Sequence, residues 1–244
     1  MPKVEVNDIE MYYEVHGEGE PLLMLHGFTG SGQMWNPYIP DYETHFQLII
    51  PDYRGHGKTN NPSKEFTARQ ASEDMFAFLN HLVIEKVKGI GCSTGGDILL
   101  HMATNQPDRM EAMVLDGAVP YYPRQFRDME YQVTDEKMEQ YRQWHHLGED
   151  QINTIIQNVL DMKVDYDDMN FTKPLLSTIK AKTLIMLGDK DPYYPVETAT
   201  ILYDSIPDSY LWIYPNAGHA LTYYQIDSVK KVAFDFLTGK WDDS

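Results

Sequence analysis

The chain of 244 residues is 42% hydrophobic, enough for a sizeable core, and its 37 acidic against 20 basic side chains give a formal charge of −17. Such acidity repels phosphate backbones and anionic membranes, so we expect neither nucleic acid nor membrane as a partner. A single cysteine excludes an internal disulfide, no apolar run approaches the length of a membrane span, and the acidic first ten residues argue against a signal peptide, which together predict a cytoplasmic protein.

Short apolar runs alternate with helical patterns along the chain, which predicts an α/β fold with a mostly parallel sheet covered by helices on both faces. We expect strands within residues 11–15, 22–25, 48–50, 87–90, 113–115, 183–187 and 210–214. Apolar side chains recur at helical spacing within 71–82 and 226–237, so amphipathic helices are predicted there.

The alternation stops between Tyr121 and Thr178, where Met, Trp, Tyr and charged residues crowd together without a clear strand. We interpret residues 121–178 as a reduced cap of short helices, inserted after the strand that ends near Asp116. Residues 1–120 and 179–244 then form the core of a single domain.

Residues 91–95 read Gly-Cys-Ser-Thr-Gly and stand between a predicted strand and a helix-like stretch. A serine between two glycines at such a junction is a nucleophile elbow, in which a strained turn lifts the hydroxyl of Ser93 clear of the sheet. The pattern alone is weak because Gly and Ser are common. Three further motifs in the required chain order carry the prediction.

Ser93 needs a base, because a hydroxyl is a poor nucleophile at neutral pH. The candidate is His219, which lies in a turn after the strand at 210–214 and before the final helix. The base needs an acid to hold its tautomer, and Asp189 and Asp191 both follow the strand at 183–187. We favour Asp191, which lies further into the loop and reaches the neighbouring histidine loop, and keep Asp189 as the alternative.

The segment from His26 to Thr29 follows another strand and marks a loop near the serine. The backbone amide of Phe28 is expected to join that of Thr94 in an oxyanion hole, which holds a carbonyl oxygen as it gains charge. We interpret His26 as a structural residue of this loop.

Other polar residues are expected to have no part in catalysis. Asp52 and Arg54 are predicted to form an internal ion pair, and the adjacent His145 and His146 a surface pair on the cap. Cys92 is expected to be a buried, inert thiol that points away from the nucleophile.

No metal site is expected. The acidic stretch 165–170 lacks the glycine and the closing glutamate that a calcium loop needs.

Aromatic and apolar side chains beside the motifs and in the cap are expected to line an apolar pocket for an acyl or aromatic group of modest size. The predicted substrate-binding residues are Trp35, Tyr121, Trp144, Tyr193 and Leu221.

The four segments resemble the α/β-hydrolase superfamily, in particular its small cofactor-free serine hydrolases with a cap after the sixth strand, among them carboxylesterases, lactonases, C–C bond hydrolases and perhydrolases. The resemblance covers nearly the whole chain and is weakest in the cap. It implies a mostly parallel α/β-hydrolase sheet with helices on both faces, a short helical cap and no cofactor. By resemblance the triad is Ser93, Asp191 and His219, and the oxyanion amides belong to Phe28 and Thr94.

Cys92 and Thr94 replace the His and Met that commonly flank the serine in such enzymes, which leaves the subfamily open. A serine at the elbow argues against the dehalogenases and epoxide hydrolases of this fold, which use a carboxylate there.

We therefore expect a serine hydrolase that cleaves carboxylic esters of small to medium size through an acyl-enzyme, with lactones kept as a further class. Two alternatives stay open: a C–C bond hydrolase or perhydrolase on the same triad, and a small-molecule receptor that hydrolyses only slowly. The expected partner is a small-molecule ester, and the sequence carries no signal of oligomeric state.

Overall fold

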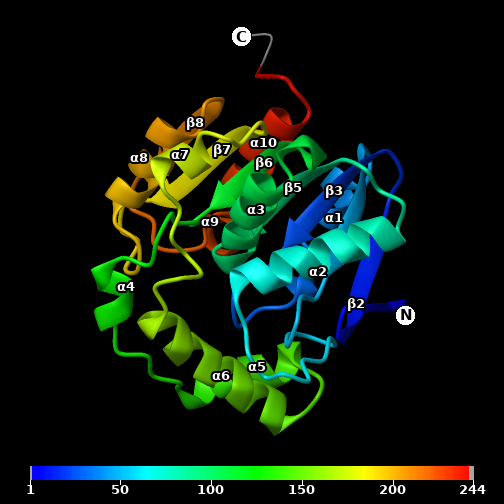
Figure 1. Ribbon diagram of the computed structural model, residues 1–244, viewed down its shortest axis with the longest axis vertical. Helices are drawn as coiled ribbons and strands as arrows, with labels where there is room; N and C mark the ends of the chain where they lie inside the picture. The colour runs from blue at the N-terminus through cyan, green and yellow to red at the C-terminus, as the bar shows by residue number, and fades with distance from the viewer. Residues whose placement is uncertain (1, 242–244) are drawn as a thin grey trace.

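The computed structural model describes residues 2–241 and confirms an α/β fold around one eight-stranded sheet (Figure 1). The strand order is β1-β2-β4-β3-β5-β6-β7-β8; β2 runs antiparallel to both β1 and β4, and the other pairs are parallel. The bounds are β1 (Lys3–Val6), β2 (Ile9–His16), β3 (Glu20–Leu25), β4 (Phe46–Pro51), β5 (Val87–Cys92), β6 (Met110–Asp116), β7 (Lys182–Gly188) and β8 (Ser209–Tyr214). Every predicted strand is present, and β1 is an addition at the sheet edge.

Helices cover both faces of the sheet, and α2 and α3 cross its front in Figure 1. None of the helices in the described chain has the length and apolar character that crossing a bilayer requires. Their bounds are α1 (Ile39–Tyr42), α2 (Ala68–His81), α3 (Thr94–Asn105), α4 (Arg124–Asp128), α5 (Asp135–Trp144), α6 (Glu149–Val164), α7 (Lys173–Leu176), α8 (Val196–Ser205), α9 (Leu221–Tyr224) and α10 (Ile226–Leu237), with the 3-10 turns η1 (Gly32–Trp35) and η2 (Pro107–Arg109).

The central strands are buried on both faces, which is why they appear in the sequence as continuous apolar runs. On β3, Leu23 and Leu25 pack into the core beneath α2, α3 and α8, whereas Leu22 and Met24 pack into the core beneath α1 and α10. This two-sided burial makes the sheet a rigid base for the loops at the carboxyl ends of its strands.

Between β6 and β7 the chain leaves the sheet and forms α4 to α7. In Figure 1, α5 and α6 lie at the bottom of the view, across from β8 and α8 at the top. We keep the name cap for residues 121–178. Helices are present there as predicted, although α6, with 16 residues, is longer than the short helices expected.

The predicted ion pair between Asp52 and Arg54 is wrong. The Arg54 side chain is fully buried and points to α2, where its Nε lies 2.7 Å from Oδ2 of Asp74. The Asp52 carboxylate instead accepts the backbone N–H groups of Gly32 (2.7 Å) and Lys58 (2.8 Å), and its burial raises its pKa to about 6. Asp52 therefore orders the turn after β4.

Candidate active site

Ser93 stands at a sharp turn between β5 and α3, with φ 51° and ψ −122°. This backbone conformation is strained for any residue with a side chain. Glycines make the turn sterically accessible: a Cβ on Gly91 would lie 2.4 Å from the carbonyl carbon of Gly95, and a Cβ on Gly95 would lie 2.3 Å from the carbonyl oxygen of Leu25. The strand-to-helix turn expected from the sequence is therefore present, and it directs the serine hydroxyl away from the sheet.

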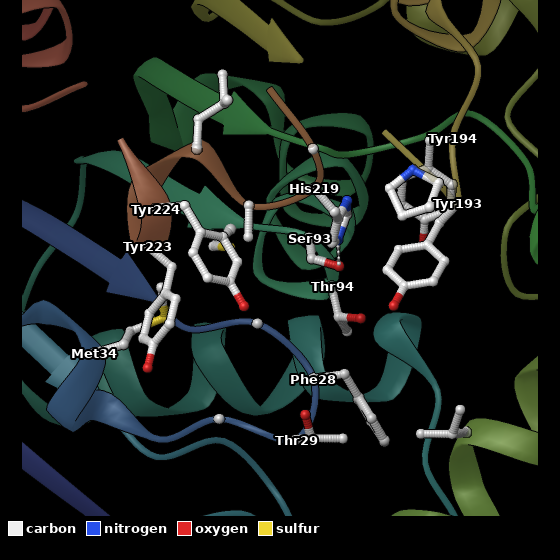
Figure 2. Close-up of a pocket in the computed structure, with 18 of the residues that line it drawn as sticks. Phe28, Thr29, Met34, Ser93, Thr94, Tyr193, Tyr194, His219, Tyr223 and Tyr224 are labelled. Atoms are coloured by element: carbon white, nitrogen blue, oxygen red, sulfur yellow. Dashed lines mark hydrogen bonds between the residues drawn. The ribbon is translucent and has the colours of Figure 1, made fainter. Parts of the chain in front are cut away.

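Three side chains from separate loops meet above this turn, and Figure 2 shows two of them, Ser93 and His219. Nε2 of His219 lies 2.9 Å from Oγ of Ser93, and Nδ1 of His219 lies 2.6 Å from Oδ2 of Asp191. Because a carboxylate only accepts hydrogen bonds, Nδ1 carries the imidazole proton and the lone pair of Nε2 faces the hydroxyl. The arrangement can take a proton from the serine as its oxygen attacks an electrophile.

The structure brings Asp191, and not Asp189, to the histidine. The Asp191 side chain is fully buried, and its Oδ1 accepts the backbone N–H groups of Tyr193 (2.8 Å) and Tyr194 (3.0 Å). Asp189 points to a neighbouring turn, where its Oδ1 lies 3.4 Å from the amide nitrogen of Ala217. The two amides on Asp191 hold its other oxygen toward the imidazole.

Two residues at the end of β6 shape the site and were not singled out from the sequence. Gly117 has φ +67°, and a Cβ there would lie 2.8 Å from Cε1 of His219, so only glycine leaves room for the imidazole. Asp116 accepts both the N–H and the O–H of Thr222 at 2.7 Å, which anchors the chain just after His219. In the sequence, the feature that could have identified them is an Asp-Gly pair at the end of a buried strand.

The loop after β3 places Phe28 beside Thr94 on the cavity wall (Figure 2). Thr94 is the first residue of α3, where backbone N–H groups and the helix dipole favour negative charge. Nδ1–H of His26 and the N–H of Gly30 both donate to the carbonyl oxygen of Gly27, at 2.8 and 3.0 Å. Burial lowers the pKa of His26 to about 3, so this ring is a neutral tie within the loop.

The meeting point opens into a cavity of about 540 Å³. Met34, Tyr223 and Tyr224 lie on one side of Ser93, and the Tyr193 and Tyr194 pair lies on the other (Figure 2). The cap contributes Phe126, Met129, Tyr131, Lys137, Gln140, Tyr141, Trp144, Val159 and Met162. Of the described residues that line it, Lys137 is the one lysine or arginine, so the wall is mainly apolar and aromatic.

The structure places Trp144, Tyr193 and Leu221 on the wall of this cavity. The prediction that Trp35 and Tyr121 line it is wrong. Trp35 is fully buried in η1, where its ring packs against the buried ring of Tyr38, three residues further along the chain. Tyr121 is 42% exposed and forms an isolated backbone bridge with another cap residue. Closeness in sequence to a motif did not reveal which way either side chain faces.

His145 is not a surface residue, contrary to expectation. Its ring is buried at the junction of the cap and the core: Nδ1 accepts the N–H of Gly57 at 3.0 Å, and Nε2–H donates to the carbonyl oxygen of Thr29 at 3.1 Å. Burial lowers the pKa of His145 to about 4. Only its neighbour His146 is exposed.

Cys92 is buried, and burial raises the pKa of its thiol well above the ordinary value, as expected of an inert cysteine. Across residues 2–241 no three His, Cys, Asp or Glu side chains gather closely enough to hold a metal ion. In the acidic stretch 165–170, Asp168 instead accepts the N–H groups of Ala68 (2.7 Å) and Arg69 (3.0 Å), so the cap docks on the start of α2.

The chain is similar to known proteins in both sequence and structure. A family described as the alpha/beta hydrolase fold matches residues 20–152. The chain is 27% identical to the serine hydrolase BPHL of Homo sapiens, over 96% of this chain and 85% of that protein. Two solved structures are similar at 20% identity: the meta-cleavage product hydrolase from Pseudomonas fluorescens (TM-score 0.83, covering 98% of this chain and 97% of that one) and the enol-lactonase from Burkholderia xenovorans (TM-score 0.80, covering 97% and 100%).

Proposed function

The chain belongs to the α/β-hydrolase family, and on that basis we propose that it is a serine hydrolase that cleaves carboxylic esters through an acyl-enzyme. One observation carries the proposal: Ser93, His219 and Asp191 form an unbroken line of hydrogen bonds at the wall of an apolar cavity. The likeness over nearly the whole chain to a human serine hydrolase supports the same chemistry.

In the proposed reaction, Oγ of Ser93 attacks the ester carbonyl while Nε2 of His219 takes its proton. Asp191 holds the tautomer and stabilises the imidazolium that forms. The imidazolium then protonates the leaving alcohol, and water, activated by the same base, releases the acid from the acyl-enzyme. The amides of Phe28 and Thr94 are assigned to the oxyanion hole, where loss of one donor typically costs about 100-fold to 1,000-fold in rate.

The substrate class we propose is neutral esters of small to medium size, with lactones as a further class. A cavity of about 540 Å³ suits a ligand of that size, and its wall extends to both sides of Ser93 (Figure 2), which leaves room for an alcohol and an acyl group on either side of the nucleophile. The net charge of −17 disfavours the approach of anions. Lys137, the one lysine or arginine among the described residues of the wall, has its Nζ 5.5 Å from the ring centroid of Tyr131, in a cation–π contact.

The test combines labelling with a substrate panel. A fluorophosphonate should attach to Ser93, and Ser93→Ala should lower kcat on a p-nitrophenyl ester by about 10⁴-fold to 10⁶-fold, as triad knockouts do elsewhere. Ser177→Ala, which alters an exposed serine in the cap, is the matched control. Full labelling of the Ser93→Ala protein would overturn the assignment of the nucleophile.

The panel holds esters, lactones, a β-diketone and a peroxide assay. Faster turnover of the β-diketone or of peroxide than of any ester would replace the proposed activity by C–C hydrolysis or perhydrolysis on the same triad. A labelled Ser93 with negligible turnover on the whole panel would indicate a receptor.

A further inference from the structure

Thr29, directly after the proposed oxyanion residue Phe28, adopts a left-handed backbone conformation with φ 65°. This conformation is unfavourable for a β-branched residue, so the surroundings have to hold it. Two histidines do so: the N–H of Thr29 points to Nε2 of His56 at 3.4 Å, and its carbonyl oxygen accepts Nε2–H of His145 at 3.1 Å. His56 belongs to the core, whereas His145 belongs to the cap and follows α5 directly, as its C-cap residue.

The direction of the hydrogen bond from His145 is fixed by its other nitrogen. Nδ1 accepts the N–H of Gly57, so the proton of the neutral ring sits on Nε2 and faces Thr29. Gly57 has φ +54°, and a Cβ there would lie 2.0 Å from Oδ2 of Asp52, so the turn that presents its N–H is tightly closed. If Nδ1 were protonated, its N–H would face the N–H of Gly57, and neither group could accept a hydrogen bond from the other.

The hold on Thr29 is transmitted to Phe28 through two planar peptide groups. In a trans peptide the C=O and the following N–H point in opposite directions. His145 fixes the carbonyl of Thr29, and the N–H of Gly30 in that same peptide donates to the carbonyl oxygen of Gly27 at 3.0 Å. The carbonyl of Gly27 shares its peptide with the N–H of Phe28, so fixing one fixes the direction of the other.

We propose that His145 is a positioning residue through which the docked cap aligns the oxyanion amide of Phe28. The inference rests on the proposed function, since it concerns the amide assigned there to the oxyanion hole. His145 does not itself line the cavity in the described chain, so it acts on the reaction only through the loop. The cap thereby completes the catalytic arrangement in addition to shaping the pocket.

A pair of substitutions separates the two hydrogen bonds of the ring. His145→Asn keeps an acceptor close to the position of Nδ1 for Gly57 but removes the donor to Thr29. His145→Gln places an amide N–H near the position of Nε2 and keeps that donor. His146→Asn, at the exposed neighbouring position, is the matched control.

The readouts are kcat per active site titrated with a fluorophosphonate, KM, and the inhibition constant of a trifluoromethyl ketone, which forms an oxyanion when the serine adds to it. H145N should lower kcat by about 10-fold to 100-fold, short of the full loss of an oxyanion donor, with KM little changed. The inhibition constant should rise by the same factor. H145Q should restore most of kcat, and H146N should match the unmodified protein.

Equal losses in H145N and H145Q that follow thermal stability, or an unchanged inhibition constant in H145N, would overturn the role of His145. If H145N does not fold, His145→Leu, which keeps the bulk of the side chain, takes its place against H145Q. The two proposals fail separately: an unmodified protein that is not labelled at Ser93 overturns the proposed function, whereas a labelled, active protein whose kcat survives H145N overturns only the inference about His145.

Discussion

Asp191→Asn exchanges one oxygen for an amide group and leaves the shape of the side chain unchanged. In the native site Oδ1 of Asp191 accepts the N–H groups of Tyr193 and Tyr194, and Oδ2 faces Nδ1 of His219. The oxygen of the new amide should stay with the two backbone donors, so its NH₂ group points at the histidine. Nδ1 must then accept, the proton moves to Nε2, and Nε2 can no longer take the proton of Ser93.

The size of the expected loss of kcat follows from the free energy of the alternative orientation of the new amide group at position 191. Turning the amide around would restore the histidine tautomer but would set NH₂ against the backbone N–H groups of Tyr193, which is partly buried, and Tyr194, which is buried. The cost is about 1–3 kcal/mol for each unsatisfied donor. A total of about 2–6 kcal/mol leaves the competent tautomer about 30-fold to 10⁴-fold less populated, at about 1.4 kcal/mol per tenfold. The lost stabilisation of the imidazolium adds to this, and the same change in a serine protease lowers kcat by about 10⁴-fold.

The assay is kcat on a short-chain p-nitrophenyl ester, per site titrated with a fluorophosphonate. Asp189→Asn is the matched control, because that side chain lies two residues away and has no contact with the histidine among the hydrogen bonds of residues 2–241. It should change stability more than kcat. Retention of more than a tenth of kcat by D191N, or an equal loss in D189N, would refute the reasoning about the acid.

Three further outcomes are expected. Gly91→Ala places a methyl group against the backbone of Gly95 and should lower the free energy of unfolding in urea by about 3 kcal/mol or more. Gly218→Ala, whose new Cβ would lie 4.0 Å from Cδ of Pro192, should change that free energy by less than about 0.5 kcal/mol. Similar values for the two variants would contradict the close packing at the elbow. Burial lowers the pKa of His145 to about 4 in the folded protein, against about 6.5 when unfolded, so its contribution to stability is present above pH 6.5 and is lost as pH falls. Between pH 7 and pH 5 the free energy of unfolding should therefore fall by about 2 kcal/mol more in the unmodified protein than in H145Q. Parallel curves of that free energy against pH for the two proteins would contradict this. Neutral p-nitrophenyl esters of short to medium acyl chains should be cleaved faster than long-chain or anionic ones, and added salt should narrow the penalty on the anionic ones; a penalty indifferent to salt would contradict the role of surface charge.

The sheet could be predicted because strands buried on both faces appear as continuous apolar runs, and the elbow because its steric demands leave little choice but glycine at positions 91 and 95. The strand β1 was missed because only alternate side chains of this four-residue edge strand are buried, which leaves no apolar run. Asp191 was favoured over Asp189 on reach alone, and the two amides that hold its carboxylate depend on the local turn.

The misassigned residues share a cause: their environment is supplied by segments far away in the chain. Arg54 finds its partner on α2, 20 residues on, and His145 is buried only because the cap docks against loops about 90 to 116 residues earlier. Trp35 lies beside a motif in sequence, yet its side chain packs into the core. Periodicity reports which face of its own element a residue occupies and carries no information on what another segment brings to it.

The cap leaves from β6 and returns to β7, and these strands are neighbours in the sheet. An insertion between adjacent strands can be lengthened, shortened or replaced in evolution while the sheet beneath keeps its register. If His145 aligns the oxyanion loop, that freedom has one restriction. A recombined cap would have to bring a hydrogen-bond donor to the carbonyl of Thr29, or the loop would have to acquire a donor from the core, so new specificity could not be acquired by exchanging pocket walls alone.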